Sequence, residues 1–272
     1  MHAVLADPEN DVPRLAFAAL IRDSDPDRAK LIELQIEEAK VARARGNNSR
    51  ADIVSPATQL LKRNEARWSR TLAKYAYRLR YDRGFVASMW IEPYMFLEYG
   101  EFLYANAPIV AVEFGPPADG PMPFAELAAS PLLAQLGAVT FSLKPDQLTQ
   151  RSLELFLASS HLTSLLFVIN STRDTAAMSY TELAKLDRVR QLLVFDVAPN
   201  SPGQHYRETG AEDLSGRPLY AWTPLEPEGV ALEQTYGYLP WLHPNDNYAD
   251  PVDVRWLVQH GKRPKHAVGS RV

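Results

Sequence analysis

A fixed spacing of apolar residues recurs four times in the middle of the chain. Each copy has the form apolar-x-x-apolar-x-apolar, and successive copies start 27, 26 and 27 residues apart. Apolar residues at alternate positions predict a strand with one buried face. A further copy at Val86, Met89 and Ile91 would begin the series. The twelve positions of the four copies are Ile109, Val112, Phe114, Leu136, Val139, Phe141, Leu162, Leu165, Phe167, Val189, Leu192 and Val194.

Stretches with helical spacing lie between the predicted strands. They cover residues 123–136, 146–160 and 179–188, and Ser179 and Glu182 form a capping-box pattern at the start of the last one. Strand and helix alternating at a nearly constant period predict parallel strands in chain order, with the helices on one side of the sheet. An ordinary α/β domain with strand–helix units of similar length is the alternative.

The spacing resembles that of leucine-rich repeats, whose period is about 20–29 residues. The third copy, LTSLLFVIN, has Asn170 where the repeat motif places asparagine, and the other copies lack this residue. The resemblance implies an α/β fold. We expect a short leucine-rich-repeat-like solenoid, with parallel strands, helices on the outer face, an N-terminal helical cap and an irregular C-terminal cap.

The positions between the apolar letters of each copy should point to the open face of the sheet. This face begins with polar or small residues and becomes apolar towards the last two copies, which predicts a patch suited to protein binding. Either the tryptophans of the C-terminal segment or a partner protein should cover the apolar end. The predicted protein-binding residues are Trp90, Glu113, Thr140, Leu166, Val168, Leu193 and Phe195.

Three helices are expected before the repeats, over residues 12–23, 26–44 and about 56–80. Asp25 is suited to the N-cap of the second helix, and Pro26 to its first position. In the third stretch, apolar residues from Leu60 to Leu79 recur three, four and seven residues apart. This spacing predicts one long amphipathic helix.

Residues 3–115 resemble the bacterial repeat-companion domain, a short helical unit that precedes leucine-rich-type repeats. The resemblance rests on AVLADPENDVPRLAFAALI, DPDRAKLIELQ, Arg83-Gly84-Phe85-Val86 and FLEYGEFLYANAPIVAVEF. The chain departs from the family at Ala19, where an acidic residue followed by Trp is usual. The resemblance implies a cap plus repeats and, by analogy only, a binding role. The expected domains are 1–83 (helical cap), 84–198 (solenoid) and 199–272 (C-terminal cap and tail).

The C-terminal segment, residues 199–272, breaks the repeat. It holds 9 of the 21 prolines and 3 of the 5 tryptophans, namely Trp222, Trp241 and Trp256. Proline alone would suggest disorder, but this aromatic content favours a packed structure. We expect an irregular cap that packs through its aromatic side chains.

Composition and charge narrow the class of protein. The 272 residues are 46% hydrophobic, with no cysteine and no apolar run of membrane-spanning length. The start of the chain lacks a signal-peptide pattern, so a cytoplasmic protein with no membrane partner is expected. The net charge is −4, yet residues 40–83 hold 12 basic against 3 acidic residues. This basic band could face nucleic acid, although an acidic protein repels phosphate at long range.

The sequence contains no nucleophile elbow, phosphate loop or dinucleotide fingerprint. His243, Asp246, Asp250 and Asp253 lie close together in the chain but match no defined zinc or calcium spacing. No catalytic residue, metal or cofactor is therefore expected. The sequence favours a non-enzymatic protein-binding scaffold, such as an immunity or adaptor protein that binds a toxin or effector. The alternatives are a nucleic-acid-binding protein that uses the basic band, and an enzyme with its site in the C-terminal segment.

Overall fold

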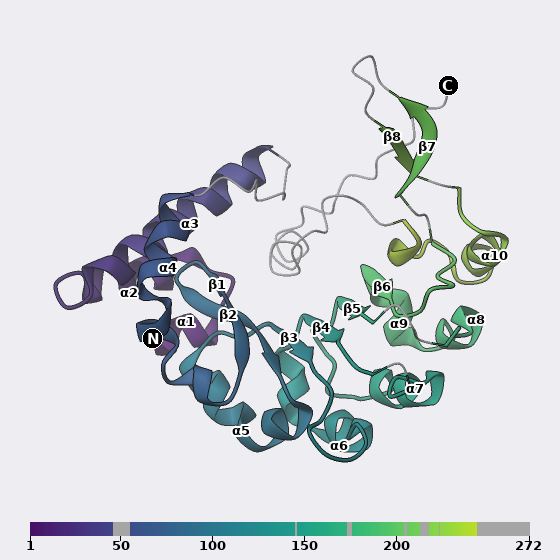
Figure 1. The fold of residues 1–272 in the computed structure, drawn as a ribbon, viewed down its shortest axis with the longest axis horizontal. Coiled ribbons are helices and arrows are strands. Elements are labelled where there is room, and N and C mark those ends of the chain that lie inside the picture. The colour runs from purple at the N-terminus through teal and green to yellow at the C-terminus, as the bar shows by residue number, and fades with distance from the viewer. Residues whose placement is uncertain are drawn as a thin grey trace.

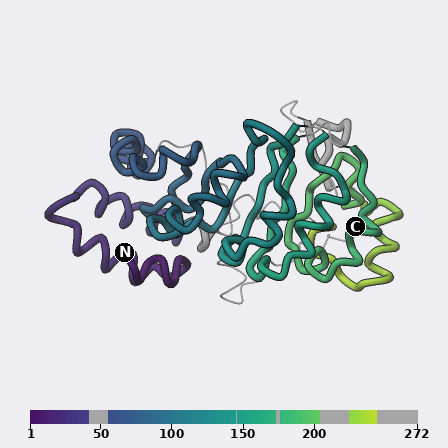
Figure 2. Tube along the Cα trace, turned by 90° about the horizontal axis from the view of Figure 1, so that it is seen from below, coloured from purple at the N-terminus to yellow at the C-terminus, as the bar shows by residue number. Residues whose placement is uncertain are grey.

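The computed structural model describes residues 1–45, 55–144, 146–172, 176–203, 206–212, 218–222 and 224–243. Its strands and helices follow an arc from the N-terminal helices to the C-terminal part (Figure 1). Seen from below, the successive strand–helix units lie side by side along the long axis (Figure 2).

Helices form the first part of the chain and then alternate with strands. The N-terminal elements are α1 (His2–Ala6), α2 (Asp11–Ile21), α3 (Pro26–Arg45), α4 (Pro56–Ser69), η1 (Leu72–Lys74), β1 (Tyr77–Asp82) and β2 (Phe85–Ile91). The repeat elements are α5 (Pro93–Asn106), β3 (Ala111–Phe114), α6 (Phe124–Ala129), η2 (Pro131–Gln135), β4 (Ala138–Phe141), α7 (Gln150–Leu157), β5 (Phe167–Asn170), α8 (Tyr180–Leu183), α9 (Asp187–Gln191) and β6 (Val194–Asp196). The C-terminal elements are β7 (Tyr206–Glu212), β8 (Pro218–Trp222), α10 (Pro227–Tyr236) and η3 (Pro240–Leu242).

The main sheet has six strands in the order β1-β2-β3-β4-β5-β6. β1 pairs with β2 in antiparallel fashion, whereas β2 to β6 are all parallel. Helices α5 to α8 lie on the outer side of the arc (Figure 1). The predicted α/β class is thus confirmed, as are parallel strands that are neighbours in chain order. The division into three domains stays a prediction.

The register of the last two copies differs from the sequence-based assignment. Val112 pairs with Val139 as predicted, but Val139 pairs with Val168 and Val168 with Phe195. Val168 and Phe195 therefore point into the main core, at 0% and 2% exposure, and not to the open face. The predicted open-face positions of these two residues are wrong.

The error has a physical cause in the apolar pattern itself. Because Leu165 and Leu192 are buried in either register, most of the template also fits when it is shifted by three residues, and only Asn170 departs from it. The structure instead aligns Val86, Ile109, Leu136, Leu165 and Leu192, which are 23, 27, 29 and 27 residues apart. A search for uniform spacing therefore selects the wrong register, because the interval from β4 to β5 is two residues longer than the intervals on either side of it.

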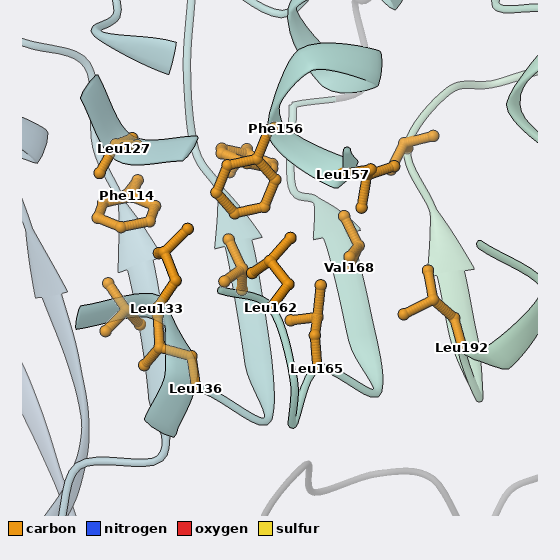
Figure 3. Close-up of a cluster of buried hydrophobic side chains, with 14 of the residues drawn as sticks. Phe114, Leu127, Leu133, Leu136, Phe156, Leu157, Leu162, Leu165, Val168 and Leu192 are labelled. Carbon is orange, nitrogen blue, oxygen red and sulfur yellow. The ribbon is translucent and has the colours of Figure 1, made fainter. Parts of the chain in front are cut away.

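The main core lies between the sheet and the outer helices. Phe114 and Phe141 stack at 6.2 Å between ring centroids, and Phe156 of α7 meets Phe141 edge-on at 5.4 Å. Leucines from the turns, including Leu133 and Leu162, fill the space beside the rings (Figure 3).

The region from 56 to 80 is not one helix. α4 ends at Ser69, and β1 begins at Tyr77 and pairs with β2. The missed signal is the alternation in YRLRYD, which has the two-residue period of a strand and competes with the helical spacing. Pairing with β2 satisfies the backbone hydrogen bonds of this segment, and this stabilises the strand relative to a helix.

Arg83, Gly84 and Phe85, part of the motif that carries the family resemblance, form the junction between the N-terminal helices and the sheet. Arg83 and Gly84 both have positive φ, at 47° and 82°. A Cβ on Gly84 would lie 2.1 Å from Cγ1 of Ile32, so α3 passes directly over this turn. Phe85 is fully buried among the N-terminal helices.

The C-terminal segment is partly described. β7 and β8 form a separate antiparallel pair, and η3 contacts β6. Trp241 is buried, stacked on Tyr180 at 5.7 Å and edge-on to Phe195 at 5.5 Å. A tryptophan of this segment thus packs against Phe195, as one alternative expected, but it does so in the main core. The side chain of Trp222 and all of Trp256 lie outside the described residues.

Candidate functional site

The candidate site is the open face, which we define as the side of β2–β6 opposite helices α5 to α9. Its central row consists of five residues in register across the parallel strands. Trp90, Glu113 and Thr140 belong to this row, as the sequence predicted. Ile169 and Asp196 occupy the places that the shifted register had given to Val168 and Phe195. Trp90, Glu113, Thr140 and Ile169 are half-buried, and Asp196 is exposed.

A second row lies two residues earlier in each strand. Ala111, Ala138 and Phe167 form a separate apolar cluster on the open face, and Val194 packs against them. Leu166 and Leu193, at the bends before β5 and β6, pack against the same cluster and are half-buried. The predicted apolar end of the face is therefore present, but it is built by Phe167 and its neighbours.

Two aromatic residues stand at the N-terminal end of the face. Trp90 meets Tyr77 of β1 edge-on, with 5.6 Å between the ring centroids. The Trp90 ring lies against Gly115, where an added Cβ would come within 1.8 Å of Cζ2. The indole ring of Trp90 therefore occupies space that a side chain at position 115 would fill. Tyr77 is 64% exposed, which makes it available to a partner.

A charged pair lies beside the aromatic residues. Nη1 of Arg78 is 3.6 Å from Oε1 of Glu113, and the two side chains are 73% and 29% exposed. Such a solvent-exposed pair adds little to stability. It does place one donor group and one acceptor group next to Trp90, where they can fix the orientation of a bound partner.

The structure places five of the residues predicted from the sequence on this face, and the sequence missed others. Trp90, Glu113 and Thr140 lie in the central row, and Leu166 and Leu193 flank Phe167 on the same face. Tyr77 and Arg78 were missed because their segment was assigned to a helix. Ile169 was missed because of the register error, and Asn170 was the available signal. Asn170 aligns with Phe141 at the end of the strand, and its side chain contacts Val197 O at 3.2 Å.

The basic band is used in part by the fold. Arg67 pairs with Asp25 at 2.8 Å, Arg78 with Glu113, and Arg83 is buried among three carboxylates. These arginines neutralise acidic neighbours, which reduces the positive field that a polyanion would meet.

The described residues hold no group of three or more His, Asp or Glu side chains that could bind a metal ion. Nε2 of His243 is 2.9 Å from Oε1 of Glu233, and its ring stacks on Tyr238 at 5.1 Å. Asp246, Asp250 and Asp253, the other members of the sequence cluster, lie outside the described residues. No helix in the described parts of the chain has the length and apolarity needed to cross a membrane.

Comparisons with known proteins add no relative to this picture. No protein-family model matches the chain, and neither a curated protein nor a solved structure matches it. The resemblance to the repeat-companion domain stays a prediction from the quoted motifs.

Proposed function

We propose that this chain is a short solenoid of the leucine-rich-repeat type that binds another protein on its open face. The observation that carries the proposal is the in-register row from Trp90 to Asp196 on the side of the sheet opposite the helices. A row of aromatic, aliphatic and charged side chains on a rigid sheet offers the mixture that protein interfaces use.

Three features support the repeat architecture. The strands are parallel and in chain order, the helices α5 to α8 lie outside, and the units are 23 to 29 residues long. The side-chain amide of Asn170 donates to the backbone carbonyls of Thr172 and Val197. Because Val197 belongs to the next unit, Asn170 joins two neighbouring units, as an asparagine of a repeat ladder does.

The residues on the open face favour a particular kind of partner. Trp90 and Tyr77 form an aromatic anchor, and such residues contribute a large share of binding energy at interfaces. Ile169 lies between two polar positions, Thr140 and Asp196. We infer a folded protein partner that places an apolar side chain between Trp90 and Ile169 and bonds to the Arg78–Glu113 pair. An adaptor or immunity-type protein that blocks a toxin or effector is the concrete form.

The test uses two matched substitutions on opposite sides of the sheet. Ile169→Arg changes the open face, and Leu155→Arg changes the outer side at a leucine of α7 that is 45% exposed. A protein captured by the unsubstituted chain from the native host is identified by mass spectrometry, and its Kd is measured by calorimetry with each variant. Ile169→Arg should weaken binding at least about a hundredfold, and Leu155→Arg should leave it within about threefold. Equal affinities for the two variants contradict the proposal.

Variants of the chain also test the alternative that the basic band, residues 40–83, binds nucleic acid. If the chain binds nucleic acid instead, retention on DNA or RNA falls steeply with salt and is insensitive to Ile169→Arg. An enzyme with its site in the C-terminal segment would lose activity on substitution of His243, whose ring contacts Glu233. The nucleic-acid result is not expected, because the arginine pairs described above engage part of the band.

A further inference from the structure

A pocket of about 230 Å³ lies where the N-terminal helices meet the sheet, away from the open face. Its walls come from Met1, α2, α3, the end of α4 with η1, β2 and the end of α5. The lining residues that matter to the argument are Phe17, Arg28, Trp68, Thr71, Phe85 and Ala105. Of the eleven residues that line the pocket, Arg28 is the only one whose side chain carries a formal charge.

Arg28 has a buried donor without a partner. Its Nε is inaccessible to solvent and makes no hydrogen bond. The guanidinium lies over the Phe85 ring, 5.4 Å from the ring centroid. Burial lowers the pKa of Arg28 from its ordinary value, but an arginine keeps its charge at neutral pH. Arg28 as a whole is half-buried, and an anion that reaches its guanidinium from the pocket would offset the cost of this partial desolvation.

The nearest carboxylate is engaged by other donors. Oδ1 of Asp25 accepts from the backbone N–H of Arg28 at 3.2 Å and from Arg67 at 2.8 Å. Oδ2 of Asp25 accepts from Nε1 of Trp68 at 2.9 Å. These bonds cap α3 and fix the indole against the pocket. The Asp25 carboxylate thus supports the pocket wall, and the bond that it accepts from Arg28 comes from the backbone N–H.

A second unpaired donor lies near Arg28. The hydroxyl of Tyr81 is buried without a hydrogen-bond partner. Burial raises the pKa of Tyr81 to about 12, so the hydroxyl keeps its proton at neutral pH. Arg28 and Tyr81 are close enough to interact electrostatically. Tyr81 is not one of the residues that line the pocket, and Arg28 remains the one charged side chain in its lining.

We propose that this pocket binds a small carboxylic acid that carries an apolar ring or chain. A single arginine can neutralise one negative charge, and its planar group matches a carboxylate with two parallel hydrogen bonds. Phe17, Trp68 and Phe85 supply aromatic walls for the apolar part. The volume is below the roughly 300–1,000 Å³ of pockets that take drug-sized ligands, so the ligand is small.

The test compares a carboxylate with its neutral counterpart. Phenylacetate and phenylacetamide have the same ring and nearly the same shape, and they differ in charge. Binding is measured by calorimetry and by the NMR signal of the Trp68 indole N–H, which lies at the pocket wall. We expect phenylacetate to bind and to shift this signal, and phenylacetamide to bind at least tenfold more weakly, which corresponds to about 1.4 kcal/mol. Equal binding of the two probes, or no binding of phenylacetate at 10 mM (about ten times the concentration that a millimolar site requires), overturns the proposal.

Substitutions in and around the pocket test whether phenylacetate binds there. Arg28→Gln should weaken phenylacetate binding at least tenfold, and Arg22→Gln, which changes an exposed arginine at the end of α2, should not. Ala105→Trp is the second variant, because Ala105 is an exposed lining residue and its substitution blocks the pocket without touching Arg28. Unchanged binding in Ala105→Trp overturns the proposal even if Arg28→Gln does not fold. The proposal is also overturned if a peptide with a C-terminal Phe binds through its terminal carboxylate and phenylacetate does not bind.

Discussion

The junction around the β1–β2 turn contains five charged side chains, whereas the repeats from β3 to β6 are filled by aromatic and aliphatic ones. In the junction, Arg83 contacts Asp82 at 2.7 Å, Asp11 at 3.1 Å and Glu9 at 3.3 Å. Arg14 donates to the backbone carbonyls of Asp82 and Arg83. In the strands from β3 to β6, the buried positions are instead held by apolar residues such as Phe114 and Phe141.

The two regions differ in how strongly they specify geometry. Dispersion and hydrophobic contacts are non-directional, so a stack of phenylalanines and leucines can be extended by one more unit. The charged junction fits one arrangement only, because each donor of Arg83 must meet its acceptor. Burial alone lowers the pKa of Arg83, but Asp82 and Glu9 outweigh it and hold the pKa above its ordinary value. We infer that the junction defines where the parallel strands begin.

The largest effect is expected from breaking the junction. Arg83→Met leaves Glu9 and Asp82 buried without their counter-charge, which should cost about 3–5 kcal/mol of unfolding free energy. Urea unfolding measures this loss. The control is Arg22→Met, which removes an exposed pair with Glu33 and should cost less than about 1 kcal/mol. Similar losses for the two variants would show that the junction does not depend on its charges.

The next effect concerns the core of the repeats. Leu165→Ala removes a side chain that is 1% exposed and should cost about 2–5 kcal/mol. Leu155→Ala, on the outer surface of α7, should cost less than about 1 kcal/mol. The same unfolding experiment compares them. If Leu155→Ala were the more damaging, the assignment of the core side in this unit would be wrong.

A smaller effect appears at alkaline pH. Burial raises the pKa of Tyr180 to about 12, above its unfolded value of about 10. The stability that comes from the buried neutral phenol is therefore complete below pH 10 and is lost as the pH rises through 12. By pH 11.5 the loss should reach about 2 kcal/mol for the unsubstituted chain relative to Tyr180→Phe, out of the about 2.7 kcal/mol that two pKa units represent.

The Tyr180→Phe comparison separates this tyrosine from the junction. Burial lowers the pKa of Arg14 to about 10, so its contribution to stability increases as the pH rises from 10. Both chains contain Arg14, and their difference reports Tyr180 alone. Urea midpoints at pH 9 and pH 11.5 give the measurement. A difference that does not change with pH refutes the prediction.

The smallest effect is expected on the open face. Thr140→Ala changes a half-buried side chain in the middle of the sheet and should alter the unfolding free energy by less than about 1 kcal/mol. Thermal unfolding compares it with Leu165→Ala. Equal melting temperatures for these two variants would mean that the sides of β4 and β5 are not as described.

The sequence predicted what depends on periodic apolar residues and failed where two periods compete. The strands from Val86 to Phe141 were placed correctly, because only one register buries their apolar residues. Val168 and Phe195 were misplaced because both registers bury leucines, and backbone pairing with β4 decides between them. Asp25 was correctly identified as the N-cap of α3, since capping is local.

The candidate site was predicted in part for the same reason. Trp90, Glu113 and Thr140 follow from alternation along single strands. Tyr77 and Arg78 reach the face through the β1–β2 hairpin, a tertiary contact that the local pattern of 56–80 does not reveal. The pocket at Arg28 joins residues from six segments of the chain, and no local pattern brings these together.

The most direct test of the central claim is position-specific photo-cross-linking from the open face. The chain has no cysteine, so Thr140→Cys and Leu155→Cys each carry a single thiol for a benzophenone maleimide. The two labels lie on opposite sides of the sheet and are exposed to the same host extract. If the open face binds a protein, the label at residue 140 cross-links to a defined partner and the label at residue 155 does not. The same partner cross-linked from residue 155 alone would contradict the account.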